Sequence, residues 1–209
     1  MNRLTFVSGW AGHPDLFPRL SQAAQFLHPF VLQTPEEIQD ALRAGEGEML
    51  VGWSTGAHLV LKDLPELSKR YEQIVLIAPF YQYTRCLYRS TVLKMIENFD
   101  KNPVRTVRAF YRTCGVRGAD ASWCDAYRDE LRAGLEFLLD SEAVFAPDKE
   151  YPHVLVLAGL SDQIVPVSEA VEIAGKLPRA QYRALTTGHY VPEEELEKSV
   201  EEATGRSLF

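Results

Sequence analysis

The sequence has 209 residues, 46% hydrophobic and 24% charged, a composition typical of one globular domain with a full apolar core. The formal net charge of −7 argues against a general nucleic-acid binder. No apolar run approaches the roughly 18 residues of a membrane span, and the N-terminus lacks the layout of a signal peptide. Three cysteines, at spacings that suit no metal, indicate free thiols, so we expect a cytoplasmic protein.

Short β-type runs alternate with helical patterns along the chain, which favours an α/β fold with a parallel sheet. Helical spacing of apolar residues from Leu16 to Leu27 predicts a first helix, and Pro35 and Gly45 should bound a second. A later helix should begin at 166–168 and carry Ala170, Val171 and Ala174 inward, and a last one should span 192–203. The expected strands are 4–8, 30–33, 49–52, 74–77, 154–158 and 181–185.

The alternation stops between residues 80 and 148, where the periodicity is helical and no strand is evident. We therefore predict a core made of residues 1–79 and 149–209, with a helical cap, or lid, of residues 80–148 inserted into it. This insertion is also basic. From Arg85 to Arg117 there are eight Lys or Arg against two acidic residues, in a chain that is otherwise acidic.

A possible nucleophile lies where an apolar strand passes directly into a helical run, in Gly52-Trp53-Ser54-Thr55-Gly56. This is the G-x-S-x-G pattern of a nucleophile elbow, in the strand–turn–helix context that the motif requires. Bulky side chains two positions either side of the serine would crowd so tight a turn, and glycines relieve that crowding. Ser54 is therefore the predicted nucleophile.

Acyl transfer by a serine also needs a base and a carboxylate that orients it. In this kind of sheet they follow the serine in the order Asp, His, each just beyond the end of a strand. Asp162 follows the strand 154–158, and His189 follows the strand that ends at 185. The 27 residues between them suit one helix and one strand, which should make the two loops neighbours.

The other histidines are weaker candidates. His58 lies four residues into the helix after Ser54, so its side chain should point away from the serine hydroxyl. His13 is near the end of the first strand and could line the pocket. His28 and His153 flank strands without a matching carboxylate.

The oxyanion of acyl transfer needs backbone donors. One should be the N–H of Thr55, directly after the nucleophile, and the other should come from the loop after the first strand. Glycines flank Trp10 in that loop and would let its backbone approach a substrate, so Trp10 is the predicted second donor. A simple strand-exit turn would explain the same glycines.

Together these motifs resemble the α/β-hydrolase superfamily, in the same order and over the whole chain. The resemblance implies a mostly parallel sheet of about six strands flanked by helices, with a cap between two strands. Because the sequence begins almost at the strand before the oxyanion loop, we expect the usual first two antiparallel strands to be missing. Ser-Gly-Trp also replaces the commoner His-Gly, and together these departures imply a compact form. The motifs are Ser8-Gly-Trp10, Gly52-Trp-Ser-Thr-Gly56, Gly159-Leu-Ser-Asp162-Gln-Ile-Val-Pro166 and Gly188-His189-Tyr-Val-Pro192.

Within that superfamily, the two Gly-Trp motifs are similar to those of the carboxylesterases of biotin synthesis. These enzymes hydrolyse the methyl ester of pimeloyl-acyl carrier protein, and arginines of their caps dock the acidic carrier. Arg105, Arg108 and Arg112 repeat on one helical face here, and Arg85 and Arg89 are four residues apart. They are the predicted docking residues; the alternative is a solvated face paired with acids of residues 120–150.

The sequence therefore predicts a serine carboxylesterase that uses Ser54, His189 and Asp162 and needs no metal or other cofactor. Its favoured substrate is a carrier-bound methyl ester, and the alternative is a generic small ester or thioester. A non-catalytic binding protein on the same scaffold is a further alternative, although such proteins usually lose one member of the triad. Acyl length, leaving group and oligomeric state stay open.

Overall fold

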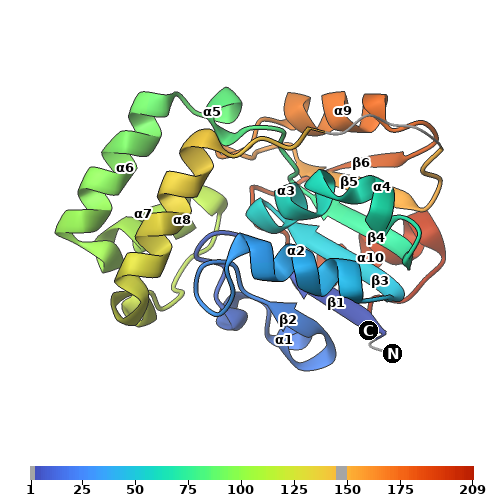
Figure 1. Ribbon diagram of the computed structural model, residues 1–209, viewed down its shortest axis with the longest axis horizontal. Helices are drawn as coiled ribbons and strands as arrows, with labels where there is room; N and C mark the ends of the chain where they lie inside the picture. The colour runs from blue at the N-terminus through green and yellow to red at the C-terminus, as the bar shows by residue number, and fades with distance from the viewer. Residues whose placement is uncertain (1–2, 145–149) are drawn as a thin grey trace.

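Six parallel strands form one sheet in the computed structural model, which describes residues 3–144 and 150–209. Their order across the sheet is β2-β1-β3-β4-β5-β6 (Figure 1). Both faces of the sheet are covered by helices, which is why most strands are continuous apolar runs. The α/β fold class expected from the sequence is confirmed. The strands are β1 (Leu4–Val7), β2 (Gln25–Leu27), β3 (Gly47–Trp53), β4 (Tyr71–Ile77), β5 (Val154–Gly159) and β6 (Gln181–Leu185).

The second strand was predicted wrongly. Residues 30–33 form a turn, because Phe30 has a positive φ of 69° and leaves the extended conformation. The strand comes earlier because the predicted first helix is split by prolines into a short 3₁₀ turn, η1 (Pro14–Leu16), and α1 (Pro18–Ala23). Leu27, expected on the helix, is instead a buried residue of β2.

The helices of the core lie in two layers. One face of the sheet packs against α2 (Pro35–Ala44), α3 (Thr55–Lys62), α4 (Leu64–Leu67) and α9 (Val167–Lys176). The other packs against α1 and α10 (Glu193–Thr204). In α9 the buried apolar residues are Ala170 and Ile173, whereas Val171, predicted to face inward, is half exposed. Ile173 lies on the apolar face of α9 instead of Val171.

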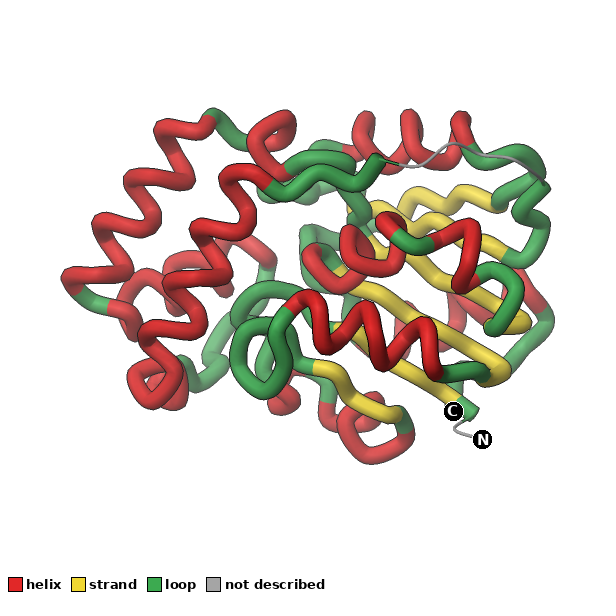
Figure 2. Tube along the Cα trace, in the orientation of Figure 1, coloured by secondary structure: helices red, strands yellow, loops and turns green. Residues whose placement is uncertain are grey.

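Between β4 and β5 the described chain is helical and lies beyond one end of the sheet (Figure 2). We call its residues 80–144 the cap; the predicted boundary at 148 falls outside the described residues. The division into core and cap domains stays a prediction. Throughout the described chain, every helix is too short or too polar to serve as a membrane span. The cap contains α5 (Tyr83–Cys86), α6 (Arg89–Lys101), α7 (Pro103–Cys114), η2 (Ser122–Tyr127) and α8 (Arg128–Asp140).

The strand order reverses direction beside β1. The chain leaves β1 towards β2 on one side and returns through α2 to β3 on the other. Loops from the two neighbouring strands therefore diverge at their carboxyl ends, and ligands of open α/β sheets bind at such a switch point. Trp10 follows β1 and Ser54 follows β3, so both lie at this position.

Candidate active site

Ser54 lies in a strained turn between β3 and α3, with φ 55° and ψ −116°. A non-glycine residue in such a conformation costs roughly 1–3 kcal/mol, which the surrounding packing must offset. The flanking glycines are required sterically. A Cβ at Gly52 would lie 2.8 Å from the Cα of Ala57, and one at Gly56 would lie against the carbonyl oxygen of Val7. The turn therefore depends on both glycines of the motif.

The structure brings Ser54, His189 and Asp162 together in one hydrogen-bonded chain. The Oγ of Ser54 lies 2.8 Å from Nε2 of His189, and Nδ1 of the same ring lies 2.8 Å from Oδ2 of Asp162. All three side chains are buried or nearly so. A carboxylate can only accept, so Nδ1 carries the hydrogen and Nε2 is left to accept the serine proton.

The carboxylate of Asp162 is held by its own loop. Its second oxygen, Oδ1, accepts from the backbone N–H groups of Ile164, at 2.7 Å, and Val165, at 2.9 Å. These bonds leave Oδ2 directed at the imidazole and satisfy the buried charge, which would otherwise be costly. The orientation of the base is thus set by a rigid turn after β5.

One residue that holds His189, Trp53, was not predicted from the sequence. Its indole Nε1 donates to the backbone oxygen of His189 at 2.8 Å, and the two rings pack with centroids 5.4 Å apart. The tryptophan next to the serine was a visible signal in the motif, but its partner is 136 residues away. Trp53 therefore ties the nucleophile strand directly to the loop that carries the base.

Both predicted oxyanion donors lie beside the serine. Thr55 is the first residue of α3, where helix N–H groups have no partner within the helix. The N–H of Trp10 points at Thr55, whose hydroxyl oxygen accepts from it at 3.4 Å. Trp10, Ser54 and Thr55 line one small cavity of about 10 Å³. This juxtaposition is what an oxyanion hole requires, and the role itself stays a prediction.

That cavity holds little more than one water molecule, so an ester fits only if side chains move. Four of its lining residues, Tyr83, Met95, Phe110 and Ile164, also line a groove of about 770 Å³ along α6 and α7. They therefore form the wall between the buried serine and the open surface. The groove therefore adjoins the cavity that contains Ser54.

Comparison with solved structures decides the fold. The chain superposes on an esterase, EaEST, from Exiguobacterium antarcticum with a TM-score of 0.70 and 14% identity, over 98% of this chain and 92% of that one. An enol-lactonase from Burkholderia xenovorans LB400 gives 0.69 and 14%, over 99% and 92%. The esterase RhEst1 from Rhodococcus sp. ECU1013 gives 0.65 and 18%, over 98% and 89%. The chain has the α/β-hydrolase fold.

At these identities the similarity shows the fold alone. No family model matches the sequence, and no curated protein sequence matches it. The predicted roles of Ser54, Asp162 and His189 in this α/β-hydrolase fold therefore rest on their geometry.

The remaining histidines have structural partners in this α/β-hydrolase fold. His58 points away from Ser54, as predicted. Its Nδ1 lies 3.0 Å from the oxygen of Phe80, its Nε2 lies 2.8 Å from Oγ of Ser141, and burial lowers its pKa to about 4. His58 thus bridges the two ends of the cap.

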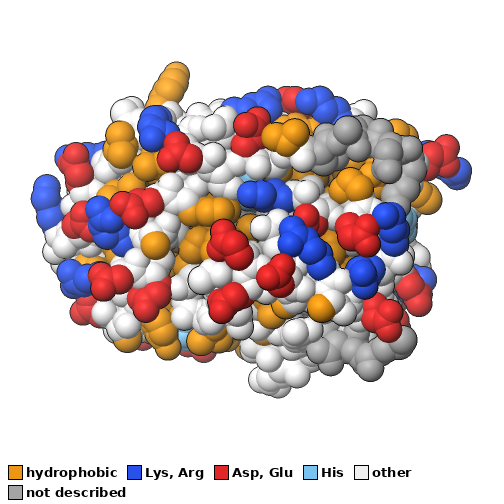
Figure 3. Space-filling view, in the orientation of Figure 1, with side chains coloured by type: hydrophobic (Ala, Val, Ile, Leu, Met, Phe, Trp, Pro, Cys, Tyr) orange, Lys and Arg blue, Asp and Glu red, His pale blue; other side chains and the backbone are white. Residues whose placement is uncertain are grey.

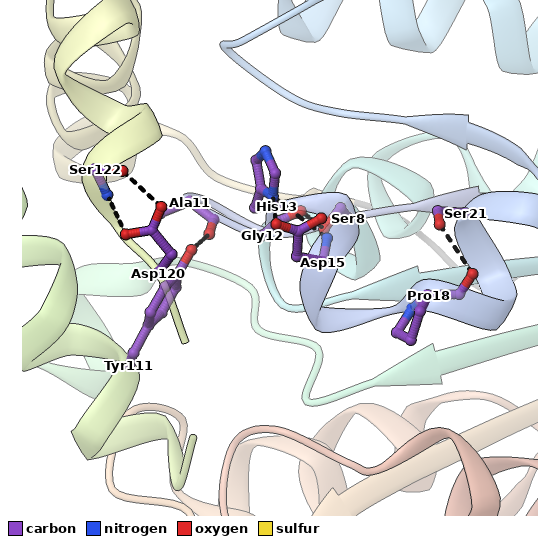
Figure 4. Close-up of polar contacts among 10 residues, drawn as sticks. All are labelled: Ser8, Ala11, Gly12, His13, Asp15, Pro18, Ser21, Tyr111, Asp120 and Ser122. Atoms are coloured by element: carbon purple, nitrogen blue, oxygen red, sulfur yellow. Dashed lines mark hydrogen bonds and ion pairs between the residues drawn. The ribbon is translucent and has the colours of Figure 1, made fainter. Parts of the chain in front are cut away.

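His13, which we expected could line the pocket, lines neither the cavity nor the groove. Its ring stacks on Trp123, with centroids 4.6 Å apart, and its Nδ1 accepts from the N–H of Asp15 (Figure 4). His28 is buried behind it, and burial lowers the pKa of His28 to about 4. The carbonyl oxygen of His153 accepts from the N–H of Ile74, at the opposite end of the sheet from Ser54.

The five predicted docking arginines lie in different surroundings, and their docking role stays a prediction. Arg85 pairs with Glu172 at 2.8 Å and Arg89 with Asp140 at 2.8 Å, so acids of the same chain neutralise both. On the face seen in Figure 3, acidic and basic side chains of the cap are interspersed. Arg105 lines the groove along α6 and α7, whereas Arg108 and Arg112 line a second surface groove of about 660 Å³.

No group of three potential metal-ligating side chains occurs among residues 3–144 and 150–209. The three cysteines are unpaired. Burial raises the pKa of Cys86 to about 12 and that of Cys124 to about 11, so both are protonated thiols at neutral pH. The predicted nucleophile stays the hydroxyl of Ser54.

Proposed function

We propose that this protein is a carboxylic ester hydrolase that works through an acyl-enzyme on Ser54. The observation that carries the proposal is the pair of 2.8 Å contacts from Ser54 through His189 to Asp162, built on a strained elbow. Strain of this kind is stored where a function needs it. The esterase and lactonase with similar folds support the same reaction class.

In the proposed reaction, Oγ of Ser54 attacks the ester carbonyl carbon while Nε2 of His189 accepts the hydroxyl proton. The N–H groups of Trp10 and Thr55 stabilise the oxyanion, and Asp162 stabilises the imidazolium. Collapse of the intermediate expels the alcohol, which takes the proton from His189. Water then attacks the acyl-enzyme by the same route, and the acid leaves with Ser54 restored.

Reaction with a fluorophosphonate probe tests this proposal. The probe should label the native protein at Ser54, and labelling should be lost in Ser54→Ala. Hydrolysis of a short nitrophenyl ester should be lost in the same variant. Absence of both labelling and hydrolysis in the native protein would favour a non-catalytic binding scaffold instead.

For the substrate, we propose the methyl ester of pimeloyl-acyl carrier protein, with the carrier bound at the cap. Support comes from the motif resemblance and from Arg105, Arg108 and Arg112, which are exposed on α7. Within the described chain none of the three forms an ion pair within 4.0 Å, and Asp120 lies near enough to Arg108 for an electrostatic interaction. Cationic rims of this kind accelerate association with an acidic partner. Arg85 and Arg89 contribute less because their charges are already paired.

Charge reversal separates the carrier-bound substrate from a generic small ester. Replacing Arg105, Arg108 and Arg112 by Glu should lower kcat/KM for the carrier-bound methyl ester at least about tenfold. The value of kcat/KM for a short nitrophenyl ester should stay unchanged. The matched control is the reversal of three basic residues of the core, Arg3, Arg179 and Lys198, which changes net charge equally. Failure to restore growth of a biotin-requiring strain that lacks this esterase step, with good activity on short esters, would favour the generic esterase.

A further inference from the structure

The side chain of Trp10 belongs to the packing of the cap, although its backbone belongs to the loop after β1. Its indole Nε1 donates to the carbonyl oxygen of Leu131 in α8 at 2.8 Å. Its ring packs edge-on against Phe110 of α7, at 5.0 Å between centroids, and against Phe99 of α6, at 6.1 Å. Three cap helices therefore hold the side chain of the residue whose N–H is the proposed oxyanion donor.

The next residue, Ala11, is held by the cap as well. Its φ is +53°, a conformation that costs a non-glycine residue roughly 1–2 kcal/mol. The carbonyl oxygen of Ala11 accepts from Oη of Tyr111 at 2.8 Å and from the N–H of His13 at 3.0 Å (Figure 4). Tyr111 comes from α7, 100 residues along the chain. A loop in a costly conformation keeps it only while such contacts persist.

The hydroxyl of Tyr111 is suited to a permanent donor role. The side chain is buried, and burial raises the pKa of its hydroxyl, which therefore stays protonated. Within the loop itself, Ser8 Oγ donates to the carbonyl oxygen of Gly12 at 2.6 Å, so a hydrogen bond joins the first and last residues of the loop. Between Ser8 and Gly12, the cap supplies the side-chain hydrogen bond to Ala11.

We infer that Tyr111 is a positioning residue for the oxyanion donor at Trp10, and that the docked cap completes the oxyanion hole. The inference rests on the proposed hydrolase function. The cap then has two roles at once: it forms the wall over Ser54, and it fixes the loop that stabilises the transition state. A displacement of the order of 1 Å in such a donor can cost about a hundredfold in rate.

The test compares Tyr111→Phe, which removes only the hydroxyl, with a matched control, Tyr71→Phe. Tyr71 is equally buried and its hydroxyl bonds to Thr5, but it begins β4 at the end of the sheet away from Ser54. The measurements are kcat and KM for a short nitrophenyl ester, and the inhibition constant of an alkyl trifluoromethyl ketone. Addition of the serine to this ketone forms a tetrahedral oxyanion.

We expect Tyr111→Phe to lower kcat about tenfold or more and to raise the inhibition constant of the ketone by the same factor. KM should stay within about twofold of the native value. Tyr71→Phe should lower the melting temperature comparably and change neither kcat nor ketone affinity. The inference is wrong if Tyr111→Phe loses no more kcat than the control, or if kcat falls while ketone affinity is kept. Inactive native protein would instead remove the proposed function, and this inference with it.

Discussion

The two halves of the candidate site are held by different parts of the molecule. The triad is organised mainly by the core: the elbow orients Ser54, backbone N–H groups of its own loop hold Asp162, and Trp53 holds His189. The cap touches this half at one point, where the carbonyl oxygen of Cys114 accepts from the N–H of Tyr190 at 3.0 Å and Phe110 packs against the His189 ring. The oxyanion side depends on the cap, through contacts of α7 and α8 with Trp10 and Ala11. The core therefore builds the proton relay, and the cap governs the transition-state donor and access to the serine.

The largest effect should come from breaking the core half. Ser54→Ala or His189→Ala should lower kcat for any ester by about six powers of ten, because each removes a group that the others cannot replace. The fold should persist, since the sheet packs independently of both side chains. Turnover of a nitrophenyl ester, with circular dichroism as the control for folding, checks this. Substantial residual turnover in Ser54→Ala would exclude this serine as the nucleophile.

A fall in pH should weaken the packing of the cap on the core at His58 and His28. Burial lowers the folded pKa of His58 and of His28 from 6.5 to about 4, so the folded state favours their neutral forms. The stability that each contributes is present above pH 6.5 and is lost as pH falls towards 4, on the order of 3 kcal/mol per group. Urea unfolding at several pH values measures how steeply the free energy of unfolding changes with pH. This slope should be smaller in His58→Asn. An unchanged slope in that variant would assign the dependence elsewhere.

Access to the serine should respond to changes in the cap. Phe110→Ala removes part of the wall between the cavity and the groove, so it should raise kcat/KM for bulky esters relative to short ones by about tenfold. The measurement is the ratio of kcat/KM for longer-chain nitrophenyl esters to kcat/KM for nitrophenyl acetate. The same substitution in Leu87, which lines the groove but not the cavity, is the control and should leave the ratio nearly constant.

The smallest effect should come from Trp53→Phe, which keeps an aromatic ring but removes the hydrogen bond to the oxygen of His189. We expect kcat to fall by a few-fold to about tenfold, with KM steady, because the base loses alignment and no substrate contact changes. Steady-state kinetics over pH 5–9 measure this. A rise in KM without a fall in kcat would show that Trp53 acts on substrate binding instead.

The features that could be predicted from the sequence are those governed by local rules. The elbow at Ser54 follows from sterics within five residues, and Asp162 and His189 follow from the rule that loops at the carboxyl ends of parallel strands are neighbours. Five of the six strands were predicted, four of them as buried apolar runs, whereas β6 is mostly exposed. The second strand was missed because it is three residues long and because prolines interrupt the helix before it.

Other features depend on contacts between distant side chains, which carry no periodic signal. Trp53 meets His189, Tyr111 meets Ala11 and His58 meets Ser141 at separations of 83 to 136 residues. The pairing of Arg85 and Arg89 with acids likewise appears only once α9 and α8 are packed nearby. Residue types and spacings thus determine the class of chemistry in this chain. The packing of the cap sets the accessible volume at the serine and the support of the oxyanion loop, because both depend on how separate elements fit together.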